Sequence, residues 1–235
     1  MRAAFAGGML AVALVAAVPA VAADMPLKAP QAPVAAPTWT GTYIGINGGW
    51  ASGTSNHSFQ SGPSTGDFDI SGGVAGVTYG GNWQAGHVVL GFESDFDWAH
   101  INGTVNNGIC VGGGGTTCFT NTKWLSTERM RAGWDFNGWL LYGTAGAAFA
   151  RVRAGQDGCP VTFCGERTRT GWTAGVGVET MFWQNWSAKL EYLHYDLGND
   201  FMYTPGPSVR VLDRGDMIRA GINYHFDFLN LLHLN

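Results

Sequence analysis

The chain has 235 residues, of which 13% are charged and 36 are glycines, and its formal net charge is −4. Average proteins contain about 25% charged residues and about 7% glycine, so this composition departs from that of an ordinary soluble domain. A weakly acidic chain also lacks the basic surface that nucleic acid requires, which argues against a nucleic-acid partner.

The N-terminus has the pattern of an exported protein. Arg2 precedes an apolar run to Val18, and small residues follow up to Ala23. The run is too short for a membrane-spanning helix, so we expect residues 1–23 to be a secretory signal peptide. The prolines of residues 24–38 predict an extended periplasmic linker.

From Trp39 onward, hydrophobic residues recur at every second position, which is the period of a β-strand. Asn137-Gly138 lies between two such segments and is a strong hairpin signal, because both residues tolerate a positive φ. We expect eight strands, over residues 40–51, 70–83, 87–99, 122–136, 139–152, 168–183, 186–197 and 210–226.

The connections between these strands alternate in length. Short turns are expected at 84–86, 137–138 and 184–185, and long polar loops at 52–69, 100–121, 153–167 and 198–209. This alternation is typical of outer-membrane barrels, with short turns in the periplasm and long loops outside. The predicted fold is therefore an all-β, eight-stranded antiparallel transmembrane β-barrel over residues 39–226, with a C-terminal tail at 227–235.

Aromatic residues gather at both ends of the predicted strands, as the two interfaces of a bilayer require. One group lies beside the short turns and the other lies towards the long loops. The first contains Trp83, Phe136, Trp139, Trp183 and Trp186, and the second contains Trp50, Trp98, Trp124 and Trp172. A soluble secreted β-domain, which would also alternate, does not explain two aromatic belts.

The four cysteines form two close pairs in or beside long loops. In an oxidising compartment the spacing predicts two local disulfides, Cys110–Cys118 and Cys159–Cys164. Neither pair has CxxC spacing and no histidine lies near, so a metal site is disfavoured. A crossed pairing and free thiols remain open alternatives.

Three carboxylates, Glu93, Asp95 and Asp97, alternate with aromatic residues in GFESDFDWAH (91–100), so we expect them to face the lumen. Arg129 and Arg131 occupy inward positions of the next strand. Such a lumen is just wide enough for side chains, and unpaired charges in it would be costly. We therefore predict an interior ion-pair network, with a charged conduction path or a catalytic or metal site as alternatives. Its members are Glu93, Asp95, Asp97, Arg129, Arg131, Glu179, Lys189, Glu191 and Arg219.

Several segments resemble the eight-stranded surface-antigen barrels of alpha-proteobacterial outer membranes, within the OmpA-like porin family. They include WTGTYIGINGGW and IRAGINYHF, and together they are residues 39–50, 76–98, 124–150, 172–198 and 218–226. The resemblance implies an integral outer-membrane protein that supports envelope integrity and has exposed loops. It brings no shared catalytic motif, although members have been proposed as small porins or haem binders.

Two features depart from that pattern. Such barrels usually end on an aromatic residue that the outer-membrane insertion machinery recognises, but here Phe226 is followed by nine more residues. Either Phe228 or the tail must then be tolerated in that role. Glu128 is expected on the lipid face, where a carboxylate costs up to roughly 2 kcal/mol at mid-depth. Either Glu128 lies near an interface or a bulge shifts the register of its strand.

The sequence favours a structural, surface-exposed envelope protein of the Gram-negative outer membrane, monomeric, without cofactor, metal or enzymatic activity. His57 and His100 are the histidines expected near the outer rim, and no GxSxG motif accompanies them. A lipid-A-modifying enzyme is therefore a remote alternative. Nearer alternatives are a small diffusion channel and a loop-mediated binder of haem or lipopolysaccharide, whose phosphates Arg151, Arg153 and Arg167 could contact.

Overall fold

The computed structural model describes residues 38–59, 62–106, 110, 117–157, 164–201 and 209–226. These residues belong to one compact unit, residues 37–235. The expected signal peptide, all of the linker except Thr38, the C-terminal tail and Cys159 lie outside the described residues. No helix within the described ranges is long and apolar enough to span a membrane.

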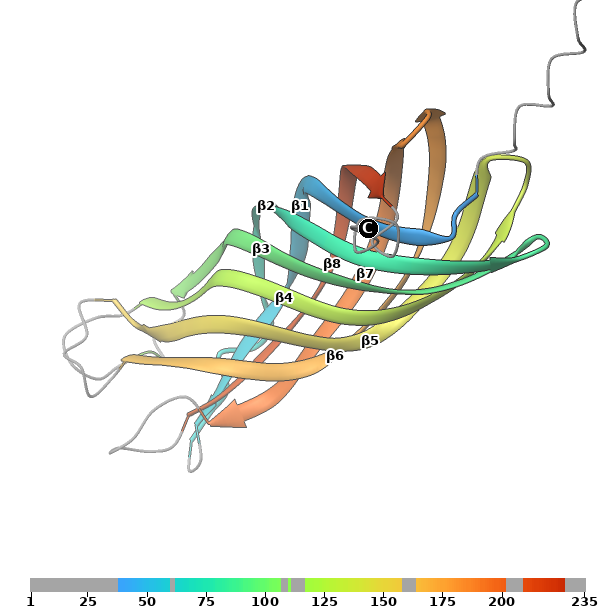
Figure 1. The fold of residues 1–235 in the computed structure, drawn as a ribbon. Coiled ribbons are helices and arrows are strands. Elements are labelled where there is room, and N and C mark those ends of the chain that lie inside the picture. The colour runs from blue at the N-terminus through green and yellow to red at the C-terminus, as the bar shows by residue number, and fades with distance from the viewer. Residues whose placement is uncertain are drawn as a thin grey trace, which may run out of the picture. The chain divides into compact units, whose positions relative to one another are not determined.

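Eight antiparallel strands close into a barrel in which each strand pairs with its sequence neighbours and β1 pairs with β8 (Figure 1). This confirms the predicted fold class. The strands are β1 Gly41–Phe59, β2 Phe68–Ala85, β3 Val88–Asn106, β4 Thr117–Asp135, β5 Trp139–Gln156, β6 Cys164–Trp183, β7 Trp186–Phe201 and β8 Val209–Phe226.

Tight turns join the strand pairs at one end of the barrel, which is called the turn end below. Asn137 and Gly138 connect β4 to β5 with φ values of 59° and 94°, as the hairpin signal predicts. The turn between β2 and β3 is Gly86-His87, one residue later than expected, because Ala85 pairs with Val88. The opposite end of the barrel is called the loop end.

At the loop end the strands are longer than predicted. β1 continues to Phe59 and β3 continues to Asn106, so the expected loops at 52–69 and 100–121 are partly strand. The backbone ladder persists because inward apolar side chains continue beyond the membrane. Ala154, for example, is fully buried in a segment expected as loop. About 10 tilted residues suffice to cross a bilayer, so strands of 16–20 residues extend well beyond it.

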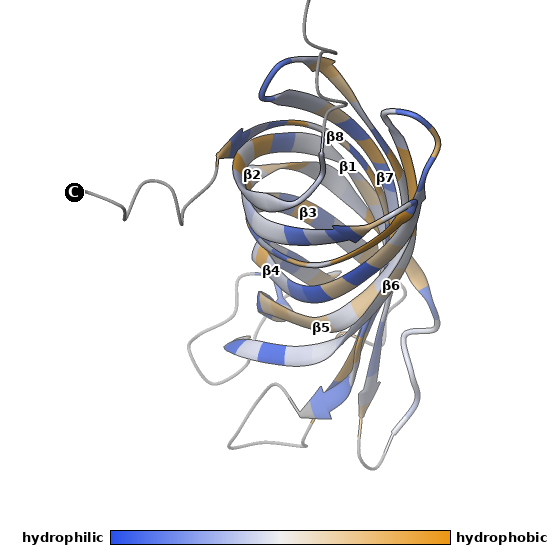
Figure 2. Cartoon of the chain, turned by 45° about the vertical axis from the view of Figure 1, so that its right-hand side comes forward, coloured by the Kyte–Doolittle hydropathy of each residue, from blue (hydrophilic) through white to orange (hydrophobic). Residues whose placement is uncertain are grey.

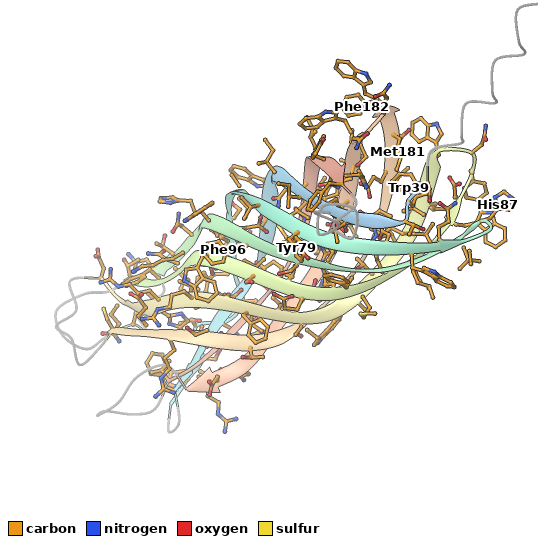
Figure 3. The ribbon with its side chains drawn as sticks, viewed as in Figure 1. Trp39, Tyr79, His87, Phe96, Met181 and Phe182 are labelled. Atoms are coloured by element: carbon orange, nitrogen blue, oxygen red, sulfur yellow. A yellow bond between two sulfur atoms is a disulfide. The ribbon has the colours of Figure 1, made fainter. Side chains whose placement is uncertain are left out.

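The outer wall is apolar, and hydrophobic residues alternate with polar ones along the strands (Figure 2). Tyr79 and Phe96 lie on this outer face (Figure 3). Exposed tryptophans form the two expected belts: Trp83, Trp139, Trp183 and Trp186 near the turn end, and Trp50, Trp98 and Trp172 towards the loop end. The outer wall thus has the pattern of a surface that faces lipid between two interfaces.

The lumen is filled by side chains in successive layers. Nearest the turn end, Trp39 packs with Val89, Leu140 and Tyr142, and all four are buried. Trp39 and Met181, a partly buried neighbour, are seen at that end in Figure 3, near His87 and Phe182. Charged residues form the next layer, and apolar side chains follow towards the loop end.

Candidate functional site

The charged layer of the lumen follows from strand periodicity. Glu93, Asp95 and Asp97 occupy successive inward positions of β3, and all three are almost completely buried. On the neighbouring strand β4, Arg129 is the register partner of Glu93, and Thr127 is the partner of Asp95. Acids and bases from adjacent strands are therefore placed at the same height.

Arg129 binds carboxylates from three directions. Its Nη2 donates to Glu93 Oε1 at 2.6 Å and also to Asp95 Oδ2. Its Nη1 donates to Glu191 Oε1, which comes from β7 on the far side of the lumen, at 2.8 Å. Because the guanidinium is a rigid fork with five donors, one arginine can join three strands.

Arg219 of β8 makes a second set of contacts from the opposite wall. Its Nε donates to Glu191 Oε2 at 2.8 Å, and its Nη1 donates to Asp97 Oδ2 at 2.9 Å. Its Nη2 donates to Asp95 Oδ2, so that oxygen receives both Arg129 and Arg219. The three strands β3, β7 and β8 are thereby connected through the lumen in addition to their backbone ladders.

Arg131 lies nearer the turn end. Its Nη2 donates to Glu179 Oε2 at 2.6 Å and its Nη1 donates to the Tyr43 hydroxyl at 2.8 Å. Its guanidinium carbon lies 4.0 Å from the centre of the Tyr142 ring, which is a cation–π contact. Desolvated cation–π contacts of this kind add to the charge pairing.

Lys189 completes the group, with its Nζ 2.8 Å from Glu93 Oε1. The geometry is that of an ion pair and not of a good hydrogen bond, since Nζ has no hydrogen-bond partner among the described residues. The structure therefore brings all nine predicted residues into one connected set, called the interior network below. Its five acids exceed its four bases by one, and Asp97 Oδ1 has no hydrogen-bond partner among the described residues.

Neutral side chains that sequence reasoning missed complete the interior network. The Tyr43 hydroxyl donates to Glu93 Oε2 at 2.8 Å, and Thr78 donates to Asp95 Oδ1 at 2.7 Å. Near the turn end, Ser187 and Asn223 donate to Glu179 Oε1. The period-2 pattern puts each of these residues on the inward face, so they could have been found by extending the charge search to hydroxyls and amides.

An apolar layer covers the interior network on its loop side. It occupies the next inward positions of seven strands, and no member is more than 7% exposed. We call it the apolar band: Ala51, Val74, Ala99, Leu125, Ala148, Leu193 and Met217. An eight-stranded lumen is too narrow for bulk water, so packed apolar side chains fill it at lower cost than unpaired polar ones.

Polar groups reappear beyond the apolar band. Asp213 of β8 is the register partner of Ser55 of β1. Ser55 is five positions closer to the loop end than Trp50 of the outer aromatic belt, so Asp213 lies outside the bilayer. Its side chain is completely buried, and its Oδ2 accepts from Thr122 at 3.3 Å. Burial raises the pKa of Asp213 to about 6.

His57, which was expected near the outer rim, lies in the same region at the loop end of β1, with its side chain on the inward face. Its ring is fully buried, with Nε2 2.9 Å from Thr120 Oγ1, and burial lowers its pKa to about 4. Arg169 is also buried here, and its Nη2 donates to the carbonyls of Leu197 and Gly198. No ion pair links Arg169 to Asp213 or to another described residue, and its Nε and Nη1 have no hydrogen-bond partner there.

The structure contains the Cys110–Cys118 disulfide, with an S–S distance of 2.08 Å. Both cysteines are completely buried. Cys164 is also disulfide-bonded, while Cys159, its predicted partner, lies outside the described residues. The first disulfide joins residue 110 to the start of β4 and thus fixes the chain at the loop end.

Glu128 faces outward, as expected, and it is not turned inward by a bulge. The irregularity in β4 lies between Thr122 and Trp124, on the loop side of Glu128. The Glu128 carboxylate accepts a hydrogen bond from Ser94, its register partner on β3, at 2.7 Å. This contact partly compensates a polar group on the lipid-facing wall.

The interior also contains a serine, a histidine and an acid in contact. Ser187 Oγ lies 2.8 Å from His225 Nε2 and donates to Glu179 Oε1. A hydrolytic triad requires the histidine between the serine and the acid, whereas here the serine lies between them. Ser187 is also completely buried. Within the described ranges, no three His, Cys, Asp or Glu side chains are placed to share a metal ion.

Known proteins resemble this chain along nearly its whole length. The family described as "Outer membrane protein beta-barrel domain" matches residues 9–226. A 31 kDa outer-membrane immunogenic protein of Brucella melitensis is 35% identical, over 93% of this chain and 98% of that protein. A 22 kDa outer membrane protein of Rhizobium leguminosarum is 34% identical, over 84% of this chain and 83% of that protein. These relatives are named for their place in the envelope and not for an enzymatic activity.

Solved barrels resemble it more distantly. The outer membrane protease OmpT from Escherichia coli has a TM-score of 0.50 at 12% identity, over 80% of this chain and 98% of that one. Neisserial surface protein A has a TM-score of 0.42 at 14% identity, over 80% and 98%. At these identities the likeness concerns the fold alone. Together with the long alpha-proteobacterial matches, the closed eight-stranded barrel establishes that the chain belongs to the outer membrane protein β-barrel family and is an integral protein of the Gram-negative outer membrane.

Proposed function

We propose that this protein is a monomeric, closed barrel that reinforces the outer membrane and displays its loops at the surface, without enzymatic activity. The observation that carries this proposal is the filled lumen. The interior network joins β3, β4, β6, β7 and β8 through side chains, and the apolar band seals it on the loop side. An ion entering the lumen would have to lose its hydration among apolar side chains, which is costly.

The absence of enzymatic activity is proposed from the chemistry of the described residues. The serine–histidine contact at Ser187 has the wrong order for a triad and is shut off from water. The charged residues of the interior network are engaged with one another, and a group that is already paired and buried is poorly placed to exchange protons with a substrate. Phe226, the last residue of β8, is proposed to serve the insertion machinery as the terminal aromatic residue.

Lipopolysaccharide is the proposed partner of the outer leaflet. Every described lysine or arginine on the outward face lies level with the tryptophans of the loop end or beyond them: Lys123, Arg151, Arg153, Arg210 and Arg214. Arginine and lysine bind phosphate by charge-assisted hydrogen bonds, and lipid A carries phosphates at this height. This distribution of charge therefore matches the outer leaflet.

Reconstitution in planar bilayers tests the closed lumen. Wild-type protein is expected to give no single-channel current, and Arg129→Ala and Asp95→Ala are expected to remain silent because the apolar band persists in both. Steady, charge-selective current steps from the wild type would contradict the proposal and favour the diffusion channel. Heat-dependent gel mobility of each variant checks that the barrel has folded.

Lipid A binding tests the proposed partner. Bisphosphorylated lipid A is expected to raise the unfolding temperature of the detergent-solubilised protein, because folding assembles the basic outward positions. Dephosphorylated lipid A is the matched control and should have a clearly smaller effect. Equal effects of the two lipids would contradict a phosphate contact.

A further inference from the structure

We propose that a groove on the outward wall of β3, β4 and β5 binds the core oligosaccharide of lipopolysaccharide. This inference rests on the proposed lipopolysaccharide contact and adds the sugar-binding part of it. The groove has a volume of about 470 Å³ and lies at the loop end. Its walls are formed by Thr104, Thr117, Phe119, Asn121, Arg153, Gln156 and Asp157.

The height of the groove follows from the strand register. Trp98 and Trp124 are register partners in the outer aromatic belt. Asn121 lies three residues beyond Trp124, which is roughly 10 Å along a strand, and it pairs with Arg153. Thr104 and Phe119 form a pair two positions farther out. Lipopolysaccharide presents acyl chains, then phosphates, then sugars along the same direction, so the groove faces the sugars.

The basic residues just below the groove are already engaged. Glu166 accepts from Lys123 Nζ at 2.7 Å and from Arg151 Nε at 2.9 Å, level with or just beyond the tryptophans. Arg153, by contrast, makes no hydrogen bond or ion pair with the described residues; its guanidinium carbon lies 5.6 Å from the centre of the Phe119 ring. Arg153 therefore has donors available for an acidic or phosphorylated sugar.

The other walls of the groove offer the groups that a sugar needs. Asn121 and Thr104 add an amide and a hydroxyl, and Phe119 adds an aromatic surface for the C–H face of a sugar ring.

Lipid acyl chains fit this groove poorly because six of the seven described residues that line it are polar. Grooves lined mainly by apolar residues occur elsewhere on the outer wall, for example beside Trp83, Leu90 and Phe92 near the turn end. The polar groove thus lies where sugars are found, while the apolar groove lies where acyl chains are found.

The test measures binding of full-length protein in detergent to lipid A, to lipopolysaccharide with a complete core, and to the released core oligosaccharide. Wild-type protein is expected to bind core-bearing lipopolysaccharide about tenfold more tightly than lipid A, since a charged hydrogen bond and several neutral ones are added. Asn121→Ala is expected to remove most of that difference while leaving lipid A binding unchanged. Arg153→Ala is also expected to remove most of it and, because Arg153 is one of the basic outward residues, to weaken lipid A binding as well. Arg214→Ala is the matched control, because it removes an exposed arginine of β8 that does not line the groove. It should keep the preference for core-bearing lipopolysaccharide over lipid A.

The outcomes of this test separate the inference from the proposed function. Equal affinity of the wild type for lipid A and core-bearing lipopolysaccharide would overturn the groove and leave the phosphate contact intact. An unchanged preference for the core in both Arg153→Ala and Asn121→Ala would also overturn it. Failure to bind either lipid would overturn the proposed lipopolysaccharide partner itself. A weak but measurable affinity for the released oligosaccharide, lost in Arg153→Ala, would support the groove.

Discussion

Arg219 of β8 and Asp97 of β3 meet inside the barrel, with Nη1 2.9 Å from Oδ2, although 122 residues separate them in the chain. Their strands are not neighbours, since β1 and β2 lie between them in the sheet. Backbone ladders alone connect adjacent strands, so this pair adds a connection that the sheet cannot provide. The interior network thus acts as cross-bracing for the barrel.

Arg219→Ala is expected to lower the free energy of unfolding by about 3–5 kcal/mol, because it leaves buried carboxylates without their partner. Asp95, Asp97 and Glu191 each lose a direct contact in this variant. Urea unfolding from lipid vesicles measures the change. Arg214→Ala, which removes an exposed arginine, should cost no more than about 1 kcal/mol. Equal losses in the two variants would show that the interior network does not brace the barrel.

Gly177→Ala is expected to destabilise the barrel by about 1–3 kcal/mol through overpacking. A Cβ at this position would lie 2.4 Å from the ring carbon Cζ and the hydroxyl of Tyr142. That ring is held by Arg131 and by its hydrogen bond to Glu191, so it has little room to move. Gly143→Ala is the control, because its nearest contact would be 4.0 Å. Equal unfolding temperatures for the two variants would refute the close packing of Tyr142.

Asp213 is expected to make the barrel more stable at pH 5 than at pH 8. Its pKa of about 6 in the folded protein exceeds that of an exposed aspartate. The folded state therefore binds this proton more tightly than the unfolded state does. The resulting stabilisation of the folded barrel is complete below the pKa of Asp213 in the unfolded chain, and it is lost as the pH rises through about 6. Burial lowers the pKa of His57, so its contribution to stability is lost as the pH falls, which is the opposite dependence. The free energy of unfolding of the wild type is therefore compared at each pH with that of Asp213→Asn.

Asp213→Asn should be more stable than the wild type at pH 8, by about 1–3 kcal/mol. The advantage should shrink towards pH 5, where the wild-type carboxyl is already protonated. Asp69→Asn changes an exposed aspartate of β2 and should leave the profile unaltered. A constant difference between Asp213→Asn and wild type at all pH values would contradict the assignment.

The period-2 pattern predicted which residues enter the lumen, because strand geometry leaves only two directions for a side chain. Glu93, Asp95 and Arg129 could therefore be placed from sequence alone. The pairing of Arg219 with Asp97 could not, since it depends on the stagger of strands around the closed barrel. A shift of stagger by two residues would give each arginine different partners without changing the pattern.

The loop end was predicted less well, and the reason is physical. Arg153 lies between Val152 and Ala154, so the alternation of β5 continues into the segment expected as loop. The glycine and polar residues of 153–167 are typical of a loop, and only a few alternating residues remain there to indicate a strand. Arg169 likewise occupies an inward position of a predicted strand, but burial without an ion pair is not a feature that sequence patterns reveal.

Accessibility of the apolar band to water tests the closed lumen most directly. Ala148→Cys introduces a thiol at a completely buried inward position, and Thr170→Cys introduces one at an exposed outward position beyond Trp172. In the folded protein, a charged, membrane-impermeant thiol reagent is expected to label Thr170→Cys fully and Ala148→Cys less than about one-tenth as fast, whereas both should react after unfolding. Rapid labelling of Ala148→Cys in the folded barrel would show that water and ions reach the lumen and would contradict the closed barrel.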